Sequence, residues 1–254
     1  MKGKPLFSCV IPVKGLRPYM EEAFESLRLQ GMGDELEVII QDGDVEPDTG
    51  QSEALNKGFA KARGEWLFWL NADDVLLPEA LKSLESRVQS LEFRRVEWMA
   101  GDTVYLDEKG VVQDVRTDAK WRPWFGKKLS VWTGGPSAFF RRELWERHGG
   151  FDADLKYAMD IDLWTRWAKA GEKFVGLGDY VWGFRMHEGS KTMGGGDKSM
   201  QMEELARIDA RHGVSSVGFW RNLTRAVNVM DGSWSKRRSD ARRLSGLDWR
   251  VVGQ

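Results

Sequence analysis

Buried strands alternate with amphipathic helices over the first hundred residues, and this alternation restricts the fold more than any other feature of the chain. Residues 6–13 form a continuous apolar and β-branched run, which is typical of a strand covered on both faces of a parallel sheet. Apolar runs at 36–40, 66–70 and 96–100 predict further strands. Helical spacing after Pro18, over 54–62 and after Pro78 predicts the helices between them. The pattern therefore predicts an open, doubly wound α/β sheet.

Acidic residues follow two of these strands. Asp42 and Asp44 come directly after 36–40, and Asp73 and Asp74 come after 66–70. In open α/β sheets, ligands bind beyond the carboxyl ends of the strands. The sequence therefore predicts a binding site at this edge of the sheet.

The pattern changes after Asp102. Two short β-rich runs at 104–106 and 111–112, separated by turn residues, predict a hairpin. A short strand is expected at 138–140, and helices are expected over 143–147 and 160–170, while the Trp-rich stretch 121–132 shows no regular pattern. We expect one domain over 1–196, followed by a basic, Trp-containing helical tail over 197–254.

The overall charge is balanced, which argues against a nucleic-acid partner. Among the 254 residues, 38 Lys and Arg stand against 39 Asp and Glu, so no global field attracts a polyanion. The single cysteine, Cys9, lies in an apolar run and fits a buried core position and a reducing, cytoplasmic compartment. No apolar run reaches membrane-spanning length, and we find no signal-peptide pattern.

The tail has a local excess of basic residues. From residue 198 onward there are 11 Lys and Arg against 6 Asp and Glu, interspersed with Trp220, Trp234 and Trp249. One interpretation is that this segment binds an anionic membrane surface, which would make the chain a peripheral protein at the inner face of the membrane. The alternative is helices packed on the domain with a solvated basic face.

Asp73 and Asp74 have the chemistry of a divalent-cation site. Carboxylate oxygens are the ligands that Mg²⁺ and Mn²⁺ prefer, and a cation relieves the repulsion between adjacent carboxylates. Asn71 lies two residues earlier and adds a neutral hydrogen-bonding group. A cap for the helix after Pro78 is the competing interpretation of the acidic pair.

Several separated segments resemble glycosyltransferase family 2 in the right order. They are residues 7–13, 41–44, 46–59, 64–65, 69–74, 149–152, 157–164 and 184–190, so the resemblance covers about 5 to 192. The family implies an inverting reaction and the GT-A fold, which is a Rossmann-like open mixed sheet flanked by helices. Here it would carry a C-terminal helical extension, with a nucleotide-binding half over 5–102 and an acceptor half over 103–196.

The resemblance also implies roles for individual residues. Those placed at the donor are Pro12, Val13, Asp42, Gln51, Asn56, Lys57, Asn71, Asp73 and Arg185. Those placed at a Mn²⁺ or Mg²⁺ ion are Asp73, Asp74 and His187, and those placed at the acceptor are Trp132 and Gly134. Asp160 would be the general base, since inverting transfer needs a carboxylate close to the attacking hydroxyl.

Each of these roles has a structural alternative. Asp160 would cap the helix over 160–170, His187 would be a structural histidine, and Trp132 would belong to the core. Lys57 and Arg185 would be ordinary solvated cations.

The most specific hypothesis is an inverting, metal-dependent glycosyltransferase. It would use a nucleotide-sugar donor, with UDP favoured, and a glycan or lipid-linked acceptor in cell-surface polysaccharide synthesis. The alternatives are a sugar nucleotidyltransferase with the same layout, and an inactive nucleotide-sugar binding protein that kept the fold.

Overall fold

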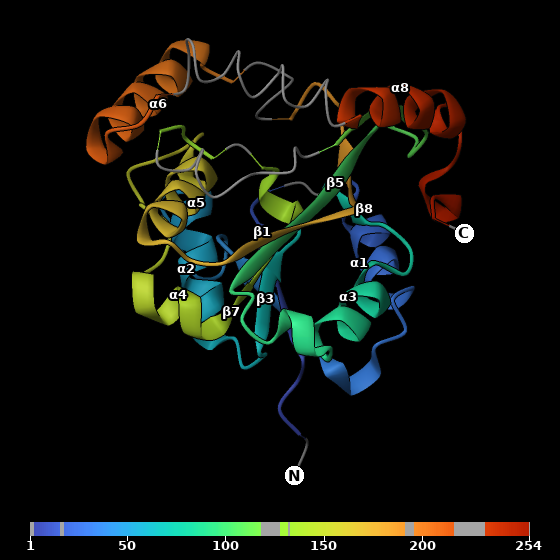
Figure 1. Ribbon diagram of the computed structural model, residues 1–254, viewed down its shortest axis with the longest axis horizontal. Coiled ribbons are helices and arrows are strands. Elements are labelled where there is room, and N and C mark those ends of the chain that lie inside the picture. Colours follow the sequence, from blue (N-terminus) through green and yellow to red (C-terminus); the bar gives the residue numbers. More distant parts are fainter. Residues whose placement is uncertain are drawn as a thin grey trace.

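Eight strands of the described chain form one mixed sheet. The computed structural model describes residues 3–15, 18–117, 128–131, 133–190, 196–215 and 232–253. Within them the strand order is β2-β1-β3-β7-β5-β8-β4, with β6 paired to β5 outside this path. Helices cover both faces of the sheet, as Figure 1 shows. The predicted open mixed α/β architecture is confirmed.

The first half of the sheet is parallel, as predicted. β1 (Phe7–Val13) lies between β2 (Leu36–Asp42) and β3 (Trp66–Trp69) and pairs in parallel with both. Helices α1 (Met20–Arg28) and α2 (Gln51–Lys61) make the two connections. All three strands therefore end at the same edge, where the segments after β1 and β3 meet.

The second half of the sheet is mixed. β7 (Ala138–Arg141) runs antiparallel to both β3 and β5 (Trp98–Leu106). β8 (Phe174–Arg185) runs parallel to β5, and the two-residue β4 (Val75–Leu76) runs antiparallel to β8. β6 (Val112–Arg116) forms the predicted hairpin with β5.

Two features of this half differ from the expectation. The predicted strand at 96–100 and the first hairpin strand are one continuous strand, β5, because Asp102 stays within it. That carboxylate is only 3% exposed, and Lys236 from α8 (Ser233–Leu244) donates to it at 3.0 Å. β8 has no counterpart among the predicted strands, because Gly176, Gly178 and Gly183 interrupt its apolar pattern.

The remaining helices complete the two outer layers. α4 (Arg142–His148) and α5 (Met159–Ala170) join α2 on one face, while α3 (Ala80–Val88) joins α1 on the other. α6 (Lys198–His212) packs on α5. Short 3-10 turns lie at Gly33–Glu35, Leu91–Phe93, Gly135–Ser137 and Trp249–Val251.

Much of the unusual tryptophan content is core. Trp98 stacks on Trp164 at 5.3 Å between ring centroids, and Trp69 stacks on Trp164 at 6.0 Å. Trp167 closes the group at 4.9 Å from Trp164. These side chains are fully buried, or within 1% of it, between the sheet and α5. The aromatic cluster therefore fixes how α5, which begins at the binding edge, lies on the sheet.

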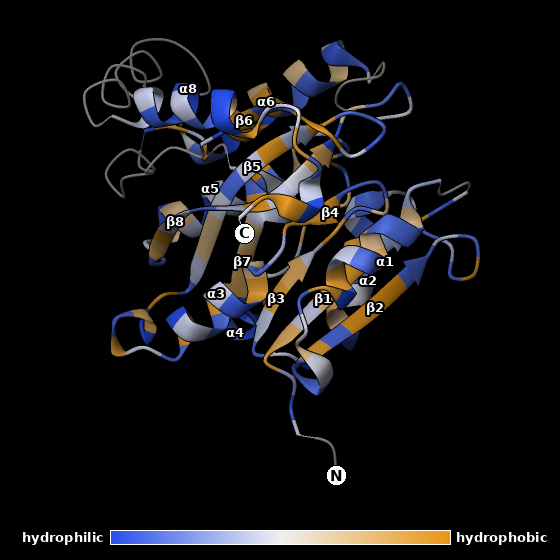
Figure 2. Ribbon diagram, turned by 90° about the vertical axis from the view of Figure 1, so that its right-hand side faces the viewer, coloured by the Kyte–Doolittle hydropathy of each residue, from blue (hydrophilic) through white to orange (hydrophobic). Residues whose placement is uncertain are grey.

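The predicted tail shares its core with the sheet. Leu244 of α8, Trp249 and Val252 pack with Val104 and Val112 of the β5–β6 hairpin. Figure 2 shows α8 as a largely hydrophilic helix, and it packs on β6. In the described ranges, no helix has both the length and the apolar character that a membrane span requires.

Close packing of α2 on β1 generates a stability prediction. A Cβ at Gly58 would overlap the fully buried side chain of Val10, which is stiff at χ1. Overpacking costs about 1–3 kcal/mol, and the gain in helix propensity offsets about 1 kcal/mol of it. Because the Val10 side chain is fully buried and cannot move aside, the cost should lie in the upper part of this range, and we expect Gly58→Ala to lower the free energy of urea unfolding by roughly 1–2 kcal/mol.

The matched control is Gly176→Ala in β8, where a new Cβ meets nothing closer than Phe174 at 3.9 Å. Its unfolding free energy should stay near that of the wild type. Equal stability of the two variants would show that the α2–β1 contact tolerates a methyl group.

Candidate active site

One cavity of about 780 Å³ opens at the carboxyl ends of β1 and β3. This volume is typical of a small-molecule site. Pro12 and Val13 at the end of β1 line it, as do Asn71 and Asp73 after β3. Asp160 at the start of α5 lines it as well. The cavity thus lies where the sheet topology predicts a ligand site.

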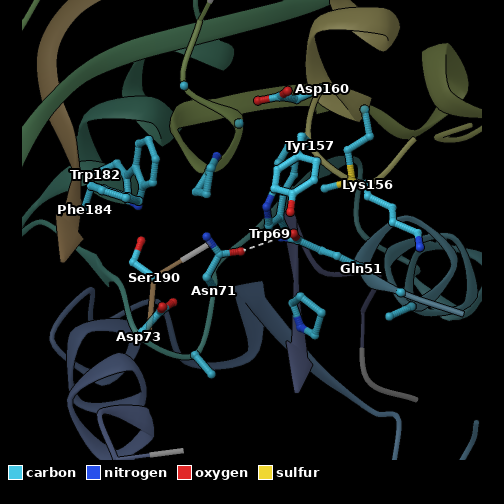
Figure 3. Close-up of a pocket in the computed structure, with 18 of the residues that line it drawn as sticks. Gln51, Trp69, Asn71, Asp73, Lys156, Tyr157, Asp160, Trp182, Phe184 and Ser190 are labelled. Carbon is cyan, nitrogen blue, oxygen red and sulfur yellow. Dashed lines mark hydrogen bonds between the residues drawn. The ribbon is translucent and has the colours of Figure 1, made fainter. Parts of the chain in front are cut away.

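The segment between β3 and β4 supplies one wall. Gln51 of α2 donates from Nε2 to Oδ1 of Asn71 at 2.8 Å, which fixes the orientation of the Asn71 amide (Figure 3). Nδ2 of Asn71 in turn donates to Oδ2 of Asp74 at 2.7 Å. The three polar side chains form a chain of hydrogen bonds that leads from the cavity into the protein.

Asp74 lies behind this wall. It is 1% exposed and does not line the cavity, and its second oxygen accepts the backbone N–H of Arg185 at 3.0 Å. Burial, and then the charge of neighbouring Asp73, raise the pKa of Asp74 well above its usual range. The structure therefore gives Asp74 a role in holding the wall and does not bring it to the cavity as a metal ligand.

Asp73 and His187 meet at the cavity surface. Nε2 of His187 lies 2.9 Å from Oδ2 of Asp73, and both residues line the cavity. The ring of Tyr19 packs on the imidazole at 5.2 Å between centroids, which restricts its rotation. The sequence places these two groups 114 residues apart, and the β3–β4 and β8 segments bring them together.

Arg185 holds the wall from inside. The side chain is fully buried, donates to the carbonyl of Asp73 at 3.0 Å and to that of Glu108 at 2.9 Å, and pairs with Glu22 of α1 at 2.9 Å. Its guanidinium also lies over the ring of Tyr19, 4.6 Å from the centroid. It does not line the cavity, so the structure does not bring the Arg185 side chain to the surface where contact with the diphosphate is expected.

Asp160 faces the cavity from the other wall. Figure 3 shows it across the cavity from Asn71 and Asp73. Its Oδ1 accepts the backbone N–H of Ile161 at 2.8 Å, so the local helix start does hold the carboxylate. A Cβ at Gly135 would collide with Trp69 and lie 3.1 Å from Oδ2 of Asp160, so this wall requires glycine at 135.

Three other expected donor residues do not line the cavity. Asp42 accepts the backbone N–H of Asp44 at 2.9 Å in the turn after β2. Asn56 holds the backbone of Phe151 through two bonds, both 2.9 Å long. Lys57 donates to the Pro47 carbonyl and pairs with Glu53. Trp132 lies outside the described residues.

Several cavity residues were not predicted as site residues. They are chiefly Tyr19, Asp48, Thr49, Lys156, Tyr157, Trp182, Phe184 and Gln201. Trp182 and Phe184 alternate along β8 and pack edge to face at 5.3 Å, so two aromatic rings form one side of the cavity. Gly134, predicted at the acceptor, lines this side too, where a Cβ would lie 2.6 Å from the Trp182 ring.

The residues at the cavity fit a divalent cation that is shared with a substrate. Among the described residues there is no group of three or more His, Cys, Asp or Glu side chains that could hold a metal ion. Asp73 and His187 nevertheless present an oxygen and a nitrogen side by side. Mg²⁺ and Mn²⁺ commonly take one or two protein ligands and complete their shell with phosphate oxygens and water.

Solved structures share the fold. TarS from S. aureus, in complex with UDP-GlcNAc, superposes with a TM-score of 0.58 at 18% identity over 72% of this chain. A mannosyltransferase from Pyrobaculum calidifontis, in complex with GDP-Man and Mn²⁺, gives a TM-score of 0.52 at 20% identity over 71%. The predicted GT-A fold is confirmed.

Sequence comparison points to the same family. The profile described as glycosyl transferase family 2 matches residues 44–96, which include both Gln51 and the Asn71–Asp74 wall. An uncharacterized glycosyltransferase of Rickettsia typhi is 23% identical in an alignment of 252 positions that covers 89% of this chain. The resemblance to glycosyltransferase family 2 is confirmed.

The matched proteins are longer than this chain. The chain spans 75% of the Rickettsia glycosyltransferase, 59% of the TarS chain and 57% of the mannosyltransferase chain. What it shares with the two solved structures is the GT-A fold. The substrates of those longer proteins are therefore not transferred to this one by similarity alone.

The buried position of Arg185 generates a prediction that distinguishes a structural role of this residue from direct contact with the donor. Arg185→Met removes the charge-assisted hydrogen bonds to the Asp73 carbonyl and to Glu22, and a hydrogen bond to a charged group contributes about 1.5–3 kcal/mol. We expect that loss in the free energy of unfolding, measured by denaturant titration.

Lys57→Met is the matched control, because the resemblance placed both cations at the donor. The Lys57–Glu53 pair is partly exposed, and its loss should cost under about 1 kcal/mol. If Arg185→Met is as stable as the wild type but binds the donor more weakly, Arg185 would have to contact the donor directly.

Proposed function

We propose that this chain transfers a sugar, with inversion, from a nucleotide diphosphate-sugar to a hydroxyl acceptor. The observation that supports this most strongly is the placement of Asp73 and Asp160 on opposite walls of one cavity. Inverting displacement needs a base on one side of the anomeric carbon and stabilisation of the departing diphosphate on the other. The two carboxylates are disposed to meet these two needs.

Asp160 acts as the general base in this proposal. Its carboxylate takes the proton of the acceptor hydroxyl while the hydroxyl oxygen forms a bond to the anomeric carbon. The bond from that carbon to the diphosphate breaks in the same step, and its electron pair goes to the phosphate oxygen. The hydrogen bond from Ile161 and the close packing of Gly135 hold the carboxylate in place.

The donor lies along the wall formed by the segments after β1 and β3. Pro12 and Val13 line the part of the cavity next to the parallel strands, where the family binds its nucleotide. Gln51 and Asn71 present amide groups to the ribose or the diphosphate. UDP is the favoured nucleotide, with support from the UDP-GlcNAc complex of TarS, while the GDP-Man complex of the mannosyltransferase makes GDP the first alternative.

Asp73 and His187 would hold Mn²⁺ or Mg²⁺ at the diphosphate. A divalent cation supplies neutralisation of the charge that develops on the leaving group. Asp74 acts indirectly, because its hydrogen bonds to Asn71 and to the Arg185 backbone keep this wall in shape. Support for the cation comes from the Asp73–His187 pair and from the Mn²⁺ in the mannosyltransferase complex.

The acceptor enters past the aromatic side of the cavity. Trp182 and Phe184 offer ring faces of the kind that stack on sugars, which supports a glycan or a lipid-linked glycan as the acceptor. Such an acceptor belongs to cell-surface polysaccharide synthesis on the cytoplasmic side of the membrane.

The proposal also includes a peripheral membrane contact of the tail. It is supported by Trp234, 50% exposed, with Arg238 over its ring. Against this, Lys236 and Arg237 on the same helix are paired with Asp102 and Asp114 of the sheet.

Asp160→Asn tests the base. We expect kcat for sugar transfer to fall by about 10²–10⁴-fold, while the donor still binds, because the amide keeps the shape and loses the proton acceptor. Transfer is measured as release of nucleoside diphosphate over a panel of UDP- and GDP-sugars. Asp154→Asn, an exposed change six residues earlier, is the matched control.

Unchanged turnover of Asp160→Asn would remove the assigned base. Release of pyrophosphate in place of nucleoside diphosphate would instead identify a nucleotidyltransferase. Donor binding by the wild type without turnover over the whole panel would identify an inactive binding protein.

Asp73→Asn and His187→Ala test the cation site. We expect both variants to lose most of the Mn²⁺-dependent gain in nucleoside diphosphate affinity, measured by titration calorimetry with and without Mn²⁺. Asp154→Asn again serves as the control and should keep the gain. Donor affinity of the wild type that does not change with chelator would contradict the cation site.

A further inference from the structure

A buried carboxylate from the tail holds the backbone in front of Asp160. Glu204 of α6 is 3% exposed. Its Oε1 accepts the N–H of Lys156 at 2.7 Å, and its Oε2 accepts the N–H groups of Tyr157 at 2.8 Å and Ala158 at 2.9 Å. One side chain therefore satisfies three consecutive backbone donors that lie 46 to 48 residues away in sequence.

These donors lie at the start of α5. The helix begins at Met159 without a side-chain cap of its own, since its N-cap residue is Ala158. The first N–H groups of a helix lack partners within it, and the helix dipole favours a negative charge at that end. Of the three donors, Ala158 is the N-cap residue and Lys156 and Tyr157 precede it, so Glu204 holds the approach to α5 and places a negative charge at this end of the helix.

The capped residues belong to the cavity wall. Lys156, Tyr157, Met159 and Asp160 all line the cavity, so the position of the Asp160 carboxylate depends on how this turn is held. Gln201, one helical turn before Glu204 on α6, lines the cavity directly. α6 therefore reaches the site through one side chain and supports it through another.

A second buried contact joins the same two helices. Asp162 of α5 is fully buried, and its Oδ1 accepts from Nε2 of His212 at 2.8 Å and from Arg211 at 3.2 Å. Both partners lie in the last turn of α6. The start of α5 is thus fixed to the middle of α6 through Glu204 and to the last turn of α6 through Asp162, which limits its tilt as well as its position.

We propose that Glu204 is a positioning residue for the base, and that α6 is thereby a working part of the active site. This inference rests on the proposed function, because it assigns Asp160 as the base. A carboxylate that accepts three N–H bonds is a strong and rigid anchor. Small displacements of a catalytic group lower turnover far more than they lower substrate affinity.

Glu204→Gln tests this directly, because the amide keeps the size but turns an N–H₂ group toward N–H donors. We expect kcat to fall by about a hundredfold, with the KM for the donor close to that of the wild type. Amide hydrogen exchange should rise at residues 156–158 and stay unchanged in the sheet. Glu203→Gln is the matched control, since Glu203 is the adjacent, exposed residue of the same helix.

Glu204→Asp provides the conservative variant. It keeps the charge on a side chain that is one methylene shorter, so kcat and exchange at 156–158 should lie between those of the wild type and Glu204→Gln. If Glu204→Gln fails to fold, the Asp variant carries the test, and a wild-type kcat in that variant overturns the proposal.

The other outcomes separate the two proposals. Raised exchange at 156–158 with unchanged kcat would make Glu204 a purely structural cap and overturn the positioning role. Unchanged exchange in Glu204→Gln would show that the three bonds do not hold this turn, which also overturns it. A wild-type protein that transfers no sugar from any donor would instead overturn the proposed function, and the role of Glu204 with it.

Discussion

The buried guanidinium of Arg185 is the interaction on which the geometry of the site depends. It joins the end of β8 to the Asp73 carbonyl, to the turn of the β5–β6 hairpin and to Glu22 of α1. Trp249, near the end of the chain, also donates to Glu22 at 3.2 Å, so the C-terminal segment stabilises the same anchor. A buried charge with several partners specifies one arrangement of the segments that it joins.

The two walls of the cavity are therefore held by different parts of the tail. The Trp249 segment supports the Asp73 wall through Glu22, and α6 supports the Asp160 wall through Glu204. Lys236 of α8 neutralises Asp102 within β5 and keeps that strand continuous. Residues beyond 197 thus act on the sheet and on the site, although the family profile matches only residues 44–96. This arrangement gives the basic residues Lys236 and Arg237 an internal role that competes with a membrane role.

Local patterns predicted what depends on local sequence. The β-α-β unit at β1, α1 and β2 was predictable, because its strands are buried runs and its helices have clear boundaries. β8 was not, because three glycines interrupt its pattern and its pairing with β5 is distant in sequence. The resemblance singled out Asp73, His187 and Asp160, and the structure brings these three residues to one cavity. The resemblance could not show that Asp73 lies at the cavity surface while Asp74 lies behind it. One feature of the sequence could have pointed to Glu204: it is a charged residue on the same helical face as the apolar residues Leu205 and Ile208.

The central claim is that one cavity holds the diphosphate between Asp73 and Asp160. A crystal structure of the protein with UDP and Mn²⁺, with anomalous data collected at the manganese edge, tests it most directly. The account predicts a manganese peak next to Asp73 and His187, and a diphosphate that extends from this peak toward Asp160. A manganese peak at other residues, or a nucleotide bound outside the cavity, would contradict it.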